Sequence, residues 1–173
     1  MGLLFNDYDY IACMPTYFLT WTTYGSHLPG DPRGSVDKQH NIPGTPRLKP
    51  HRRRYAANRA QLKSSPVRFS PAQRNLLDNT IREHCLFRHW LLHALNVRTN
   101  HVHIVVTADA SPSDVMGKLK SRCSRRLREL DPHLSRIWTT HGSTRWLNTN
   151  ETVMAAIRYV LHHQTHRPSP LPT

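Results

Sequence analysis

The sequence predicts an α+β domain with an antiparallel, ferredoxin-like sheet in the order β-α-β-β-α-β, followed by one further helix. Three observations indicate this fold. A segment rich in threonine and aromatic residues comes first, two later strands are joined by a short turn, and amphipathic helices separate the strands. A long basic segment after the first strand is expected to be an insertion into this order.

The first strand is predicted over residues 14–24 and ends at Gly25. The insertion, about residues 35–70, is interrupted by prolines and carries many basic side chains. We expect little regular structure in it beyond a short helix near residues 55–63, because long segments without periodicity rarely pack in a small domain.

The next helix is predicted to start at Pro71, with Ser70 as its N-cap, and to run to His84 or Phe87. Its apolar side is expected to contain Leu76, Leu77, Ile81 and Cys85. Two strands, residues 89–97 and 101–107, should then pair through a turn around residues 98–100.

A second long helix is expected after Ser111-Pro112, because apolar residues repeat at helical spacing up to Asp131-Pro132. These are Val115, Leu119, Cys123, Leu127 and Leu130. A strand near residues 136–140 and a second short strand near residues 144–147 are predicted to follow. The last helix is expected from Asn150, as its cap, to about Gln164, with Val153, Met154, Ile157, Val160 and Leu161 on its apolar side.

The length of 173 residues favours one domain, here expected over residues 14–167. Residues 1–13 are interpreted as an N-terminal extension, and residues 168–173 as a disordered tail. The chain has Lys+Arg 24 against Asp+Glu 11 and a net charge of +13, which favours a polyanionic partner, nucleic acid before a membrane surface. No apolar run approaches the roughly 20 residues that span a bilayer. Three scattered cysteines, an odd number, fit a reducing cytosol. We therefore expect a cytoplasmic protein without a membrane partner.

His101 and His103 stand two apart in a predicted strand, so their imidazoles should face the same side while Val102 enters the core. Two neighbouring imidazoles are half of a metal site. The pair alone is weak evidence for a metal site, since 13 histidines make about one such pair by chance. The alternative interpretation is two surface histidines on a strand. Support comes from the last helix, where Tyr159 and His163 are four apart and share a side. His163 would be a third ligand, ahead of Gln164, and Tyr159 would stand beside the metal.

The stretches Asn100-His-Val-His-Ile-Val-Val106 and Ala155-Ala-Ile-Arg-Tyr-Val-Leu-His-His163 resemble the metal-binding strand and nucleophile helix of single-tyrosine HUH endonucleases. Together with Thr20-Trp-Thr-Thr-Tyr-Gly25, they are most similar to the REP-associated tyrosine transposases. The resemblance implies a metal-dependent transposase that nicks and joins single-stranded DNA through a 5′-phosphotyrosine, often beside a hairpin. It implies Tyr159 as nucleophile and His101 and His103 as ligands of Mg²⁺ or Mn²⁺. The family often has Asn or Gln where His163 stands, and three imidazoles would also suit Zn²⁺.

Basic side chains on the second long helix and in the insertion are expected to contact DNA phosphates. They are Lys118, Lys120, Arg122, Arg125, Arg126, Arg52, Arg53 and Arg54. Two other functions stay open: a zinc hydrolase that activates water, and a non-catalytic single-stranded nucleic-acid-binding module of ferredoxin-like fold. The sequence leaves open a monomer or a homodimer, and the DNA sequence that is recognised.

Overall fold

The computed structural model describes residues 14–32, 34 and 48–162. In these residues the strands are β1 (Thr16–Thr23), β2 (Leu91–Val97), β3 (His101–Thr107) and β4 (Trp138–Leu147). The helices are α2 (Arg52–Ala60), α3 (Pro71–Phe87), α4 (Pro112–Leu130) and α5 (Asn150–His162). No helix of the described residues is long and apolar enough to cross a membrane.

The four strands form one antiparallel sheet in the order β2-β3-β1-β4. The register pairs Thr20 with His103 and Thr22 with His101, in the centre of the sheet. This order, with α3 between β1 and β2 and α4 between β3 and β4, confirms the predicted α+β, ferredoxin-like architecture.

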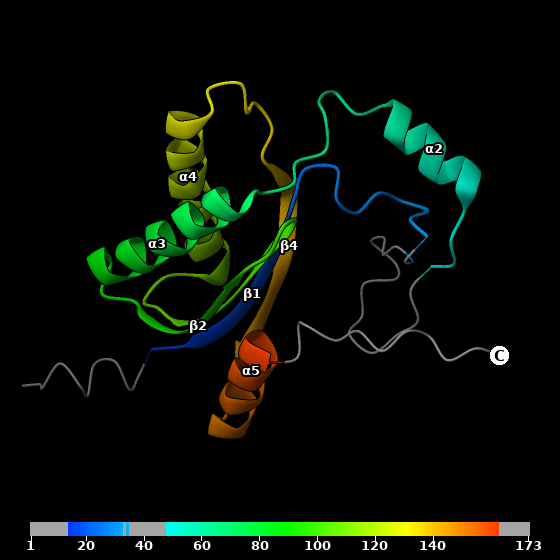
Figure 1. Cartoon of the computed structure of the whole chain (residues 1–173). Helices are drawn as coiled ribbons and strands as arrows, with labels where there is room; N and C mark the ends of the chain where they lie inside the picture. The colour runs from blue at the N-terminus through cyan, green and yellow to red at the C-terminus, as the bar shows by residue number, and fades with distance from the viewer. Residues whose placement is uncertain (1–13, 33, 35–47, 163–173) are drawn as a thin grey trace, which may run out of the picture.

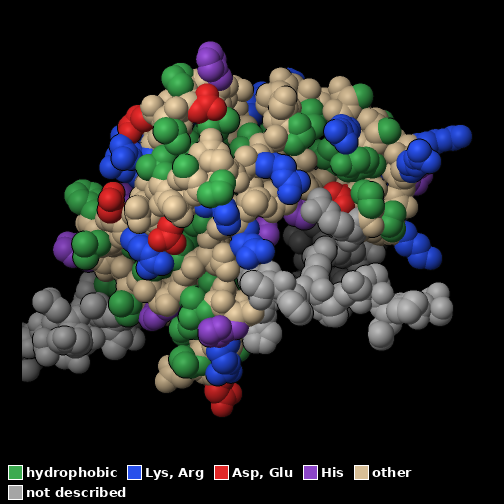
Figure 2. All heavy atoms as spheres, viewed as in Figure 1, with side chains coloured by type: hydrophobic (Ala, Val, Ile, Leu, Met, Phe, Trp, Pro, Cys, Tyr) green, Lys and Arg blue, Asp and Glu red, His purple; other side chains and the backbone are tan. Residues whose placement is uncertain are grey.

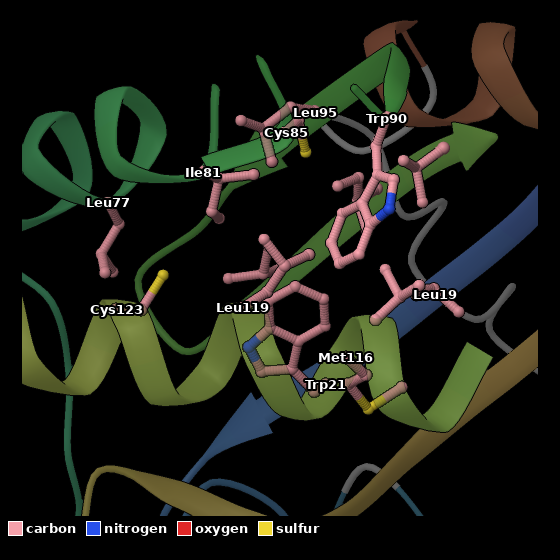
Figure 3. Packing of buried hydrophobic residues seen from close by; sticks show 14 of the residues in the cluster. Leu19, Trp21, Leu77, Ile81, Cys85, Trp90, Leu95, Met116, Leu119 and Cys123 are labelled. Carbon is pink, nitrogen blue, oxygen red and sulfur yellow. The ribbon is translucent and has the colours of Figure 1, made fainter. Parts of the chain in front are cut away.

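The two faces of the sheet are covered by different helices, α3 and α4 on one and α5 on the other (Figure 1). The alternation along β1 explains this division, since Tyr17, Leu19 and Trp21 belong to the larger core under α3 and α4. Figure 3 shows Leu19 and Trp21 converging with side chains from both helices and β2. The smaller core beneath α5 contains Ala94, Val105, Leu147, Ala156 and Val160.

The end of the sheet differs from the prediction of two short strands, because β4 is one continuous strand of ten residues. Gly142 makes the continuity possible. A Cβ there would lie 2.5 Å from Met116 Sδ and 2.6 Å from the Thr20 carbonyl oxygen, so only glycine fits between β1 and α4. A register shift between Trp21 and Thr23 accommodates the extra residues of β4.

β2 begins at Leu91, two residues later than predicted, because His89 has a φ of 55° and terminates α3. The amide of His89 donates to the Leu86 carbonyl at 3.1 Å, and that of Trp90 donates to the Cys85 carbonyl at 2.9 Å. This is a Schellman ending, with histidine in the left-handed position that glycine usually takes.

The ends of the predicted helices are confirmed for α3 and α4, including the Ser70 cap. The cap of α5 was predicted wrongly, since Thr149 and not Asn150 holds this place. The Thr149 hydroxyl accepts from the Thr152 amide at 3.2 Å, and its carbonyl accepts from the Val153 amide at 3.0 Å. Three residues that were predicted on the apolar sides of helices are exposed instead, because each lies outside the part of its helix that packs on the core. They are Leu130 on α4, and Met154 and Leu161 on α5.

The described part of the insertion is tied to the segment that follows β1. α2 starts at Arg52, three residues before the predicted helix, because the His51 imidazole caps it by accepting from the Arg54 amide at 3.1 Å. The His51 amide donates to the Gly30 carbonyl at 3.1 Å. Farther along, the Val67 amide donates to the Tyr24 carbonyl at 3.0 Å. Residues 1–13, 35–47 and 163–173, including the predicted extension and tail, lie outside the described residues.

Candidate metal and nucleophile site

The two histidines of β3 face α5, as alternation along the strand predicts. Their ring centroids lie 4.7 Å apart, with the planes at 81°. Val102, between them, is fully buried in the opposite core. His101 lies at the end of the strand and is half-buried, whereas His103 is only 8% exposed. The imidazoles therefore form a pair on the face of the sheet that carries α5.

A polar partner orients each imidazole. The Nδ1 of His101 lies 2.8 Å from Oδ1 of Asn100. Because an amide oxygen can only accept, the proton is on Nδ1 and the lone pair on Nε2. His103 shares a hydrogen bond of 2.8 Å between its Nδ1 and the Thr20 hydroxyl. Hydrogen bonds at Nδ1 are the usual support of a histidine that binds a metal through Nε2.

His103 is held in its neutral form. Its pKa is lowered from 6.5 to about 3, first by burial and then by the charges of His101 and Arg98. A neutral imidazole is the form that ligates metals, so the buried position keeps this side chain ready to bind without losing a proton. For the same reason His103 does not donate a proton near neutral pH.

Tyr159 projects from α5 towards the pair. Its ring centroid lies 5.9 Å from that of His103, edge to face, and 5.9 Å from that of Phe18. Phe18 in turn stacks on His103 at 5.7 Å. Tyr159 is nevertheless 46% exposed. The phenol is thus positioned by aromatic contacts on one side and open to a large substrate on the other.

The docking of α5 decides where this phenol lies. Ala156 and Val160 are the buried residues of the helix, and they pack on Val105 and Leu147 of the sheet. In addition, the Asn96 amide nitrogen on β2 donates to the Val160 carbonyl at 2.9 Å, in the last described turn of α5. This bond fixes the helix against the edge strand one residue after Tyr159.

His163 and Gln164, the predicted third ligand and its alternative, lie outside the described residues. In the described part of the chain no group of three ligand-type side chains could hold a metal ion. The two histidines nevertheless fit a metal: both are oriented at Nδ1, the tautomer of His101 leaves its lone pair on Nε2, and burial keeps His103 neutral. They would supply two imidazole ligands, and further positions would belong to other residues, water or substrate.

The basic residues predicted to contact DNA do not line this site. Those of α4 lie on the helix layer across the sheet from the histidines. Lys118, Arg122 and Arg125 are exposed, and Arg126 pairs with Glu129. Lys120 is half-buried, which lowers its pKa, and its ammonium donates to the Thr139 and His141 carbonyls at 3.0 and 3.3 Å. Lys120 therefore supports β4.

The other basic group stands at the opposite end of the molecule from α5. Arg52, Arg53 and Arg54 are exposed in the first turn of α2. Figure 2 shows Lys and Arg side chains projecting from the surface around this helix. A DNA contact by any of these residues stays a prediction.

Four residues of the site were missed at the level of sequence: Phe18, Thr20, Asn96 and Asn100. The alternation in β1 was a usable signal for Phe18 and Thr20, because both occupy the face opposite Tyr17 and Leu19. Asn100, next to His101, was predicted as a turn residue and opens the stretch that resembles the metal-binding strand, but no role in orienting His101 was assigned to it. Nothing in the local pattern around Asn96 indicates its bond to a helix 64 positions away.

Comparison with known proteins gives both a family and a fold. The family model described as "Transposase IS200 like" matches residues 59–150, more than half of the chain, a range that includes both histidines and ends before Tyr159. No curated protein matches significantly.

Among the solved structures similar to this chain are two transposases. A REP-associated tyrosine transposase bound to a REP hairpin has 13% identity and a TM-score of 0.51, over 84% of this chain and 64% of that chain, less than two thirds of its length. A candidate transposase from Deinococcus radiodurans R1 has 20% identity and a TM-score of 0.44, over 86% of this chain and 89% of the other. The first likeness shows a shared fold. The family model covers α3, β2, β3, α4 and β4, and this match shows that the chain belongs to the IS200-like transposase family.

Proposed function

We propose that the chain nicks and rejoins single-stranded DNA, with Tyr159 as nucleophile and a divalent cation bound by His101 and His103. The observation that carries the proposal is the convergence of three rings from two elements distant in sequence, β3 and α5. His103 contacts His101 at 4.7 Å and Tyr159 at 5.9 Å between ring centroids. Membership of a transposase family supports DNA as the substrate.

The reaction exchanges one phosphodiester for another. The Tyr159 hydroxyl loses its proton and its oxygen attacks phosphorus, while the bond from phosphorus to the 3′ oxygen breaks and that oxygen takes up a proton. The product is a 5′-phosphotyrosine and a free 3′-hydroxyl, so a later 3′-hydroxyl can reverse the step. A bound divalent cation supplies neutralisation of charge on a non-bridging phosphate oxygen.

The residues of the chain position the reacting groups. Thr20 and Asn100 orient the imidazoles, and the neutral state of His103 leaves it as a ligand and not a proton donor. Phe18 and the bond from Asn96 to α5 hold the Tyr159 ring beside His103. The exposed side of Tyr159 leaves room for a strand of DNA. Because the similar transposase was solved with a hairpin, we propose a single strand flanking a hairpin as the substrate.

The test uses labelled single strands that carry a hairpin, incubated with protein and Mg²⁺, Mn²⁺ or Zn²⁺. Wild-type protein should give a protein–DNA adduct that survives denaturation, and Tyr159→Phe should give none. Tyr17→Phe is the matched control, because Tyr17 is buried across the sheet and donates to the Ala110 carbonyl at 3.1 Å. It should still form the adduct.

Other outcomes identify other functions. Cleavage without an adduct would favour the zinc hydrolase, and binding without cleavage would favour the non-catalytic module. His103→Ala should abolish adduct formation and lower metal affinity in calorimetry. An adduct that forms equally well with a chelator present would refute the role of the metal.

A further inference from the structure

A second feature lies beside the histidine pair, at the end of the sheet where β1 ends and β3 begins. It is a pocket of 240 Å³ between the turn after β1, α2 and the segment before α3. Its lining includes Gly25, Tyr55, Arg59, Pro66, Arg68 and Asn100. We name it the α2 pocket. Figure 1 shows α2 standing out from this end of the sheet, apart from α3, α4 and α5.

The pocket connects directly to the proposed reaction centre. Asn100, part of its lining, has its side-chain oxygen bonded to His101 Nδ1 at 2.8 Å. The Asn100 carbonyl also accepts from the Thr23 amide at 2.9 Å, which ties this residue to the end of β1. Asn100 therefore links the pocket to the histidine pair, and a strand bound at the pair would run next to the pocket.

The charge of the pocket suits an anion. Arg59 and Arg68 are exposed, and in the described part of the chain neither pairs with a carboxylate. A guanidinium fork matches the geometry of phosphate oxygens and binds two of them at once. Two such groups around one small pocket form a better phosphate site than scattered surface lysines.

The framework of the pocket is fixed before any ligand arrives. Arg68 stands between Val67, whose carbonyl accepts from the Thr23 hydroxyl at 2.7 Å, and Phe69, whose amide donates to the Thr99 carbonyl at 2.7 Å. α2 is held against the turn at Gly30, where a Cβ would lie 2.6 Å from the His51 carbonyl oxygen. A ligand that binds to side chains on an already fixed backbone costs the protein less conformational entropy than one that must order a loop.

Size and shape limit the occupant. A volume of 240 Å³ is below the roughly 300–1,000 Å³ of typical small-molecule sites, so the pocket suits part of a longer ligand, such as one unit of a single strand, and is too small for a duplex. Tyr55 contributes an aromatic ring, on which unpaired bases stack irrespective of their identity. We propose that the α2 pocket binds the nucleotide next to the scissile phosphate, with Arg59 and Arg68 on its phosphate and Tyr55 on its base. This inference rests on the proposed function, because it takes the bound strand to be the substrate.

The first test measures binding without chemistry, in the full chain with Tyr159→Phe, using a fluorescein-labelled DNA single strand over a range of salt. Arg59→Ala/Arg68→Ala should reduce the slope of log affinity against log salt by about 0.7, since the two side chains are proposed to neutralise one phosphate and each neutralised phosphate on a single strand contributes about 0.7. The control Arg82→Ala/Arg88→Ala removes two charges from α3 and its C-cap, outside the pocket. It should leave the slope nearly unchanged. Equal slopes for the two double variants overturn the inference.

The second test addresses the ring with a fluorescent adenine analogue placed beside the scissile position. Tyr55→Phe should keep the quenching of this base, and Tyr55→Ala should remove it and weaken binding about five-fold or more. Quenching that survives in Tyr55→Ala contradicts stacking in the pocket. The two proposals fail separately. If wild-type protein forms no adduct but Arg59→Ala/Arg68→Ala still reduces the salt slope, only the tyrosine chemistry is refuted. If the adduct forms but Arg59→Ala/Arg68→Ala leaves the salt slope unchanged, only the proposed role of the α2 pocket is refuted.

Discussion

Thr20 and His103 lie 83 positions apart, yet one hydrogen bond of 2.8 Å joins them in the centre of the sheet. At the scale of single residues, this contact sets the direction of the buried imidazole. The hydroxyl of Thr20 meets Nδ1, so the opposite nitrogen of His103 is directed away from β1. A side chain outside the proposed ligand set thus orients one of the two proposed ligands.

Replacing Thr20 by valine keeps its shape and removes the hydroxyl. We expect Thr20→Val to lower the affinity for Mn²⁺ by about 10–100-fold, the usual effect of losing a partner behind a ligating histidine. Titration calorimetry of the purified protein measures this affinity. Thr16→Val is the control. Thr16 lies on the same strand as Thr20, but its hydroxyl bonds that of Thr107 on β3 at 2.7 Å. Equal affinities in wild type and Thr20→Val would show that the hydroxyl has no orienting role.

His93 on β2 provides a pH-dependent contribution to stability away from the site. Burial lowers its pKa below the usual 6.5, and its Nε2 lies 2.7 Å from the Thr107 hydroxyl. Below pH 6.5 the unfolded chain therefore binds a proton that the folded chain rejects, and stability falls as the pH falls.

Denaturant unfolding at pH 7.5 and 5.5 tests this contribution. His93→Gln should lose less stability between the two values than wild type, because the half-buried imidazole that resists protonation is gone. The control His133→Gln, at an exposed position, should lose as much stability between pH 7.5 and 5.5 as wild type. The interpretation fails where His93→Gln shows the full wild-type loss.

At the scale of elements, α5 is the part whose placement matters most for the proposed chemistry. It carries Tyr159, but its burial on the sheet depends on few side chains, chiefly Ala156 and Val160. The bond from Asn96 to the Val160 carbonyl adds a directional contact to this small apolar area. Position along the sheet is therefore controlled by a polar group on β2.

Asn96→Ala should loosen this placement at a cost of about 1 kcal/mol, the net value of such a bond. We expect adduct formation to slow several-fold in single-turnover experiments while the Kd for single-stranded DNA stays the same. Asn79→Ala on the exposed side of α3 serves as the control and should react at the wild-type rate. Unchanged single-turnover rates in Asn96→Ala would assign α5 placement to packing alone.

At the scale of the whole molecule, the two faces of the sheet differ in stability. The core under α3 and α4 contains large buried side chains from five elements, among them Trp21, Leu77 and Leu119 (Figure 3). The core under α5 is smaller and built mainly of Ala and Val. We infer that α5 opens more readily than the rest of the domain, because local opening follows buried apolar contact.

Hydrogen exchange tests this difference. Amides of α5 should exchange faster than those of α4, and Val160→Ala should accelerate α5 without changing α4. Leu119→Ala should instead destabilise the whole domain by about 2–5 kcal/mol. Exchange of α4 and α5 at one common rate, shifted equally by both variants, would mean that the domain opens only as a unit.

The sequence alone determined the local features of this protein. The spacing of Leu77, Ile81 and Cys85, the cap at Ser70 and the alternation around Val102 were all predicted and confirmed, since each depends on neighbours within a few residues. One failure was also local in cause, since Thr149 took the cap of α5. The other was tertiary, since Gly142 allowed one strand where two were expected by fitting between β1 and α4.

Tertiary structure alone decided which residues meet at the site. That His101 and His103 share a face follows from a period of two. That Thr20, Phe18 and Tyr159 surround His103 depends on the register of β1 with β3 and on the docking of α5. The α2 pocket depends likewise on contacts between residues dozens of positions apart. Such contacts form only when the chain closes on itself, so a linear pattern carries no signal for them.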